Sequence, residues 1–166
     1  MSKKKNITQK ALWPIIIALV VFALVWLAVT APKRLASSIT TREVALTCTT
    51  DMATKFHIHP HLTITINGTP QDIPSGIGIK PQCMNSLHTH GTGGEIHVES
   101  PEKRDFTLAD LFAVWGEPFD RTQILDQKVD DQHVIRVTVN GTTVETYEHT
   151  VLMDKDDIVI AYEEKK

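Results

Sequence analysis

The chain has 166 residues, of which 42% are hydrophobic, and a formal net charge of −3. From residue 33 onward it carries 13 basic and 20 acidic side chains, which leaves a net charge of −7 with histidine neutral. This acidic balance argues against nucleic acid or an anionic lipid surface as a partner, and it favours cations.

Residues 11–31 are an uncharged apolar run. A run of this length can cross a bilayer as one helix, so we predict a transmembrane signal anchor. Four lysines precede the run and two basic residues follow it directly, which predicts that the tail 1–10 is cytoplasmic. A cleaved signal peptide is the alternative, although Pro32 after Ala31 should obstruct cleavage. The prediction is a single-pass protein of the cytoplasmic membrane with an extracytoplasmic C-terminal domain.

Residues 32–44 show no sustained hydrophobic period and are predicted to form a tether. Residues 45–164 are long enough for one core and are predicted to form the extracytoplasmic metal-binding domain. Asn67-Gly68 and Asn140-Gly141 are strong signals for two-residue hairpin turns between alternating apolar strands. The predicted fold class is an N-terminal single transmembrane helix followed by one β-rich α+β domain, with antiparallel hairpins and one packed helix.

The one soluble helix is predicted to begin after Thr107 as its N-cap, with Asp110 reaching back to the cap. Gly116 and Pro118 end it. Apolar side chains recur at helical spacing and indicate one buried stripe, formed by Leu108, Leu111, Phe112 and Trp115.

Six of the eight histidines fall in two short segments. The first holds His57, His59 and His61, and the second holds His88, His90 and His97. Because strand side chains alternate between faces, two histidines two residues apart can share one metal ion. Pro60 interrupts the first segment, so we expect the segment at a sheet edge, at a bulge or just before the strand proper. One of its three histidines is expected to complete the site.

The glycine-rich turn 91–94 can fold the chain back and set the strand of His97 antiparallel to the strand of His88 and His90. These three histidines are therefore predicted to form the core of a metal site, with Glu99 as an accessory ligand. Glu95 is expected to orient an imidazole. Imidazole suits both Zn²⁺ and Cu²⁺, so the predicted ion is copper or zinc.

Cys48 and Cys83 are the chain's only cysteines. An extracytoplasmic location permits a disulfide, which is the favoured prediction and would close the interval that contains the first histidine segment. The alternative is that both thiolates, with Met52 or Met84, hold a soft ion such as Cu(I).

Three histidine blocks are the most specific features of the sequence: HIHPHL from residue 57, LHTH from residue 87 and IHVESP from residue 96. With Phe106-Thr107-Leu108 and Val114-Trp115-Gly116, they make residues 45–162 resemble a family of membrane-anchored bacterial and archaeal extracytoplasmic proteins. The resemblance implies that the histidine blocks and the helix belong to one domain. It implies neither a metal nor a substrate.

Three functions fit these features. The favoured one is a non-enzymatic module that holds copper or zinc for handling or for delivery to another membrane protein, because more imidazoles converge than one catalytic zinc needs. The second is a metalloenzyme in which three histidines leave a position for water and Glu95 or Glu99 is the general base. The third is a structural or interaction domain. His133 and His149 stand alone and are predicted to be surface or turn residues.

Overall fold

The computed structural model describes residues 17–22, 26 and 39–165. The chain divides into two units, Met1–Ser38 and Ile39–Lys166. The described residues of the first unit are helical, but no described helix is long and apolar enough to cross a membrane. The predicted fold class, a transmembrane helix followed by a β-rich α+β domain, is therefore wrong. The predicted tail 1–10 and much of the predicted anchor 11–31 lie outside the described residues.

The second unit is mostly β-sheet with few short helices. Its largest sheet has five strands in the order β13-β12-β14-β3-β4. The bounds are β3 His61–Ile66, β4 Thr69–Gln71, β12 His133–Val139, β13 Thr142–Val144 and β14 Asp157–Glu164. Strands β3 and β14 run parallel, and every other pair in this sheet is antiparallel.

Both predicted Asn-Gly hairpin turns are confirmed. They join β3 to β4 and β12 to β13. Asn67 and Gly68 have φ of 51° and 79°, and Asn140 and Gly141 have φ of 52° and 78°. Two consecutive residues in the left-handed region match the right-handed twist of the flanking strands, which explains why Asn-Gly occurs at both turns.

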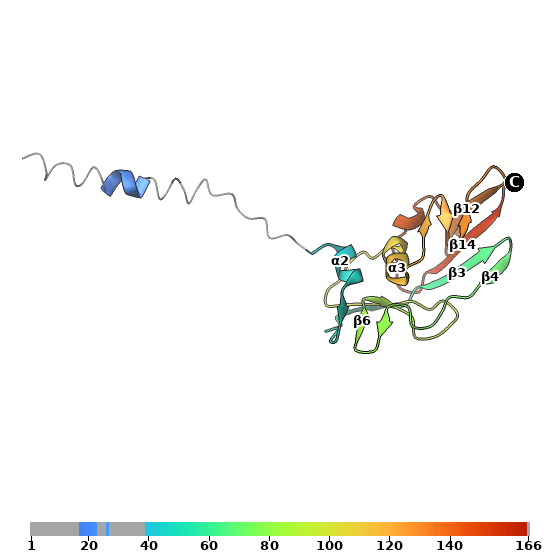
Figure 1. Ribbon diagram of the computed structural model, residues 1–166, viewed down its shortest axis with the longest axis horizontal. Coiled ribbons are helices and arrows are strands. Elements are labelled where there is room, and N and C mark those ends of the chain that lie inside the picture. The colour runs from blue at the N-terminus through green and yellow to red at the C-terminus, as the bar shows by residue number, and fades with distance from the viewer. Residues whose placement is uncertain (1–16, 23–25, 27–38, 166) are drawn as a thin grey trace, which may run out of the picture. The chain divides into compact units, whose positions relative to one another are not determined.

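Helix α3 (Leu108–Trp115) has the predicted capping box between Thr107 and Asp110, and Gly116 ends it in the left-handed conformation with φ 86°. Helix α2 (Thr41–Leu46) was not predicted and overlaps the expected tether 32–44. It begins with a second capping box, between Thr40 and Glu43. Arg42 Nε lies 3.0 Å from Asp110 Oδ1, which holds α2 beside α3 (Figure 1).

The remaining strands form three small sheets among the described residues. The first has the order β1-β6-β5, the second β11-β10-β9 and the third β2-β8-β7. Their bounds are β1 Cys48–Thr49, β2 Phe56–Ile58, β5 Ile79–Lys80, β6 Cys83–Asn85, β7 Leu87–His88, β8 His97–Ser100, β9 Phe119–Asp120, β10 Gln123–Ile124 and β11 Gln127–Lys128. A 3-10 helix, η1, covers Tyr147–His149.

One core of buried apolar side chains joins these elements. Alternate residues of β3, β12 and β14 point into it, and α3 contributes its buried stripe. The fully buried members with the largest side chains include Leu62, Ile64, Leu87, Phe106, Leu108, Leu111, Phe112, Ile158 and Ile160. This core fixes the small sheet β2-β8-β7, whose apolar face packs into it.

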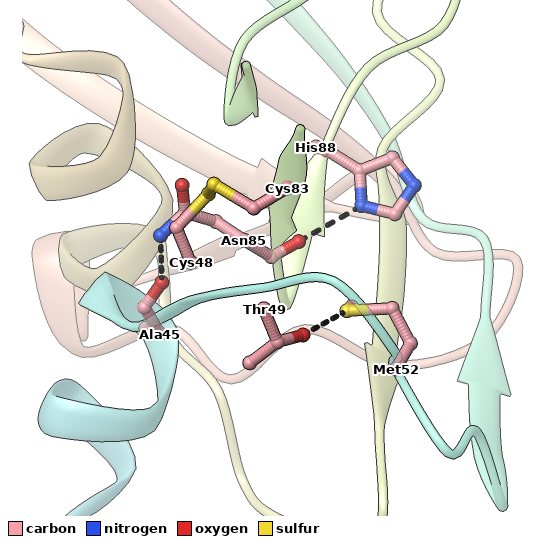
Figure 2. The surroundings of a disulfide bond; sticks show 7 residues. All are labelled: Ala45, Cys48, Thr49, Met52, Cys83, Asn85 and His88. Carbon is pink, nitrogen blue, oxygen red and sulfur yellow. Dashed lines mark hydrogen bonds between the residues drawn. A yellow bond between two sulfur atoms is a disulfide. The ribbon is translucent and has the colours of Figure 1, made fainter. Parts of the chain in front are cut away.

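Cys48 and Cys83 form a disulfide that joins β1 to β6 (Figure 2). The predicted bridge is confirmed, and ligation of an ion by these two sulfurs as thiolates is excluded in this structure. The bridge crosses the antiparallel pair in which Cys48 faces Asn85.

Candidate metal centre

Strand β8 is the centre of the sheet that carries the histidines. His97 lies opposite His88 of β7, and Glu99 lies opposite His57 of β2. Val98, between His97 and Glu99, is fully buried in the core. Because side chains alternate along a strand, the polar residues gather on one face and the apolar residues on the other. The predicted antiparallel placement of the His97 strand beside His88 is therefore confirmed.

Pro60 separates the first histidine segment into two strands, as its missing N–H predicts. Strand β2 ends at Ile58 and β3 begins at His61. His61 joins the large sheet, where its Nδ1 lies 3.6 Å from Asp157 Oδ1. His59 stays with the cluster, with its ring centroid 4.4 Å from that of His57. The structure thus brings together two histidines of this segment and leaves His61 out of the histidine groups.

The loop before β8 is held by backbone hydrogen bonds to the start of β3. Gly94 accepts a bond from Leu62 N at 2.8 Å, and Ile96 N donates to Pro60 O at 2.9 Å. Gly94 has φ of +89°, and a Cβ there would lie 1.9 Å from Leu62 O. Only glycine fits this position. The glycine-rich turn therefore also sets where β8 begins, at His97.

Four imidazoles converge around that of His97. Its ring centroid lies 4.6 Å from those of His59 and His90, 5.3 Å from that of His88 and 5.7 Å from that of His57. Two groups have ligand atoms within 4.8 Å of one another and could hold a metal ion. We call them the outer triad (His57, His59 and His97) and the inner triad (His88, His90 and His97).

His88 is the most constrained of these histidines. Its Nδ1 lies 3.0 Å from Asn85 O, and because a carbonyl only accepts, Nδ1 carries the proton. Nε2 then presents a lone pair, yet it is buried and has no hydrogen-bond partner among the described residues. An unpaired buried polar atom costs about 1–3 kcal/mol. A metal ion bound at Nε2 would satisfy it, and the Nδ1 contact is the usual arrangement behind a ligating histidine.

Two carboxylates flank the rings. Glu99 Oε1 lies 3.1 Å from His57 Nε2, and Thr54 donates to the other oxygen of Glu99 at 3.2 Å. Glu95 Oε1 lies 3.3 Å from His97 Nε2. Each carboxylate can therefore orient an imidazole. Glu99 lies beside the outer triad, whereas the sequence prediction placed it as an accessory to His88, His90 and His97.

The environment of His88 and His97 favours the neutral form of both rings. Burial lowers the pKa of His88, even though its bond to Asn85 opposes this. Burial also lowers the pKa of His97, and the neighbouring His59 and His90 lower it further. Neutral imidazole is the form that binds metal, so the fold prepares both rings for an ion.

Sequence reasoning missed Asn85, which links the disulfide to the histidines (Figure 2). Asn85 follows Cys83 in β6, its side chain donates to Ala45 O at 2.9 Å, and its own carbonyl holds His88. No motif marks it in the sequence, because its role depends on the pairing of β6 with β1.

In comparisons with known proteins, no protein family, curated protein or solved structure matched this chain. The resemblance carried by the histidine blocks therefore stays a prediction. The functional argument rests on the geometry of the five imidazoles.

Proposed function

We propose that the domain is an extracytoplasmic, non-enzymatic module that holds a copper or zinc ion for handling or delivery. One observation carries the proposal: the buried Nε2 of His88 has no partner among the described residues and belongs to a group of three imidazoles within metal-binding range. A fold that buries an imidazole with its lone pair unsatisfied is less stable without an ion than with one.

The donor set favours Zn²⁺ or Cu²⁺. Every grouped donor is an imidazole, which suits both ions, and the cysteines are held in the disulfide. The disulfide also supports an oxidising compartment, because such bridges are rare where thiols are kept reduced. Delivery is supported by His57 and His90, which are exposed and leave the cluster open to a partner that would receive the ion.

The contacts of the two carboxylates favour binding over hydrolysis. Glu99 is shared between His57 and Thr54, and Glu95 contacts His97. Both are placed to hold rings in position, which is the role of a carboxylate behind a ligating histidine.

Metal analysis of the full-length chain, purified without added metal and then equilibrated with Zn²⁺ or Cu²⁺, tests the proposal. We expect one equivalent per chain after removal of excess ion, and for Cu²⁺ an electron paramagnetic resonance spectrum with nitrogen hyperfine splitting. The His133→Ala/His149→Ala double variant is the control and should bind the same amount. Failure of the wild-type chain to retain a stoichiometric ion would overturn the proposal.

A further inference from the structure

Four of the five clustered histidines form two pairs, and the fifth, His97, contacts both pairs. Ring contacts join His57 and His59 to His97, and His97 to His88 and His90. Among the described residues no ring contact joins the first pair to the second. His97 is thus the one imidazole common to both triads. The cluster has the geometry of two adjoining three-nitrogen positions.

Each triad includes one exposed histidine, His57 in the outer triad and His90 in the inner triad, but only the inner triad includes a fully buried ring. In the inner triad, His88 is fully buried and its ring is fixed by Asn85 O. In the outer triad, the His57 side chain is 43% exposed and contacts the Glu99 carboxylate. A buried, preoriented ligand loses little freedom on binding an ion, so the inner position should hold metal more tightly.

Negative charge lies against the outer triad. The acidic turn Asp154–Asp157 packs on the chain at His59: Asp154 Oδ1 accepts from His59 N at 3.0 Å, and Lys155 N donates to His59 O at 3.1 Å. Glu99 adds a carboxylate 3.1 Å from His57 Nε2. Clustered carboxylates raise the local concentration of cations and steer their approach. Metal arriving from solvent should therefore meet the outer triad first.

We propose that the outer triad is a second metal position, which receives the ion and passes it to the inner triad while His97 remains a ligand. This inference rests on the proposed metal binding. In the transfer the bonds to His57 and His59 break as bonds to His88 and His90 form, and the charge of the ion does not change. The positions fill in turn, because both need His97 and two dications held at one ring would repel each other.

Two double variants of the full-length chain separate the positions, with Zn²⁺ as the probe and a chromogenic chelator to follow its release. His57→Ala/His59→Ala removes the outer pair, and His88→Ala/His90→Ala removes the inner pair. The wild-type chain should bind one equivalent. Loss of the outer pair should change the affinity by less than about threefold but slow release at least about tenfold, whereas loss of the inner pair should weaken binding at least about tenfold and speed release.

The single variant His90→Ala covers the case in which replacing buried His88 prevents folding, since His90 is exposed. It should also weaken binding and speed release. Equal losses of affinity in the outer and inner variants would overturn the inference and leave one shared site. Binding of two equivalents by the wild-type chain would contradict the proposal that the two positions are filled one at a time. Absence of a stoichiometric ion in the wild-type chain would instead overturn the proposed function, and this inference with it.

Discussion

His97 lies opposite His88 across β8 and β7, and the two rings stack with centroids 5.3 Å apart and an interplanar angle of 15°. The backbone register of one antiparallel pair therefore places two histidines of the inner triad side by side. Substitutions that shift this register, or that remove the contacts supporting it, should therefore weaken metal binding.

Replacing Asn85 by Ala should destabilise the protein and weaken metal binding. The change removes a buried bond to Ala45 O, which costs about 1–3 kcal/mol, and frees the segment whose carbonyl orients His88. Loss of such support typically lowers metal affinity by about 10–100-fold. Denaturant unfolding and Zn²⁺ titration measure the two effects. Gln127→Ala is the control, because the Gln127 side-chain amide donates to neighbouring Asp126 at 2.8 Å, away from the histidines. Equal metal affinity in both variants would contradict the role of Asn85.

Gly94→Ala should unfold the loop that leads into β8. The added Cβ would meet Leu62 O at 1.9 Å, in a backbone conformation with φ +89° that already disfavours alanine. We expect a loss of at least about 2 kcal/mol in the free energy of unfolding. Gly91→Ala is the matched control, because nothing lies within 4 Å of its Cβ. Equal stability of the two variants would contradict the close approach at Gly94.

Removal of the disulfide should lower stability and, through β6, metal affinity. Replacing Cys48 and Cys83 by Ala removes a cross-link between residues 35 positions apart in the unfolded chain. The loss of this constraint corresponds to about 3–4 kcal/mol in the free energy of unfolding. Zn²⁺ should still bind with one equivalent, since neither sulfur is a ligand, but more weakly because Asn85 is less well held. Thermal unfolding and titration check both parts. Complete loss of binding in a folded variant would contradict the assignment of the ligands to histidine alone.

The metal-free protein should lose stability in acid. The folded-state pKa of His88 and that of His97 both lie below the usual value of about 6.5. The unfolded chain therefore binds protons first, so the contribution is intact above about pH 6.5 and is lost as the pH falls toward the folded pKa. Thermal unfolding between pH 7.5 and 5, in the presence of a chelator, measures this slope. His88→Gln should flatten it, and an unchanged slope would count against burial of a neutral His88.

The local features of the fold were predictable from the sequence. Asn-Gly turns, the Thr107 capping box and the break at Pro60 each depend on a few adjacent residues, and the structure confirms them. Helix α2 was missed although Thr40 and Glu43 form a second capping box, because its stability comes from Arg42 reaching Asp110 and Ala45 entering the core. Both are long-range contacts. The helix is also too short for its apolar side chains to show a helical period.

The candidate site was predictable in part for the same reason. His88, His90 and His97 are joined by a short turn, so their meeting follows from local chain reversal. Whether His57, His59 or His61 would join them depended on where the chain crosses from β2 to the large sheet. Strand pairing decides this. His61 lies in β3 opposite Asp157 of β14, where it contacts that carboxylate and is not part of the histidine groups.

The most direct test of metal binding at this cluster compares His97→Ala with His61→Ala in a Zn²⁺ titration of the full-length chain. His97 belongs to both triads, and His61 to neither. We predict that His97→Ala abolishes binding of the stoichiometric ion, while His61→Ala binds one equivalent with wild-type affinity. Retention of that ion with unchanged affinity by His97→Ala would contradict the account and place the metal elsewhere.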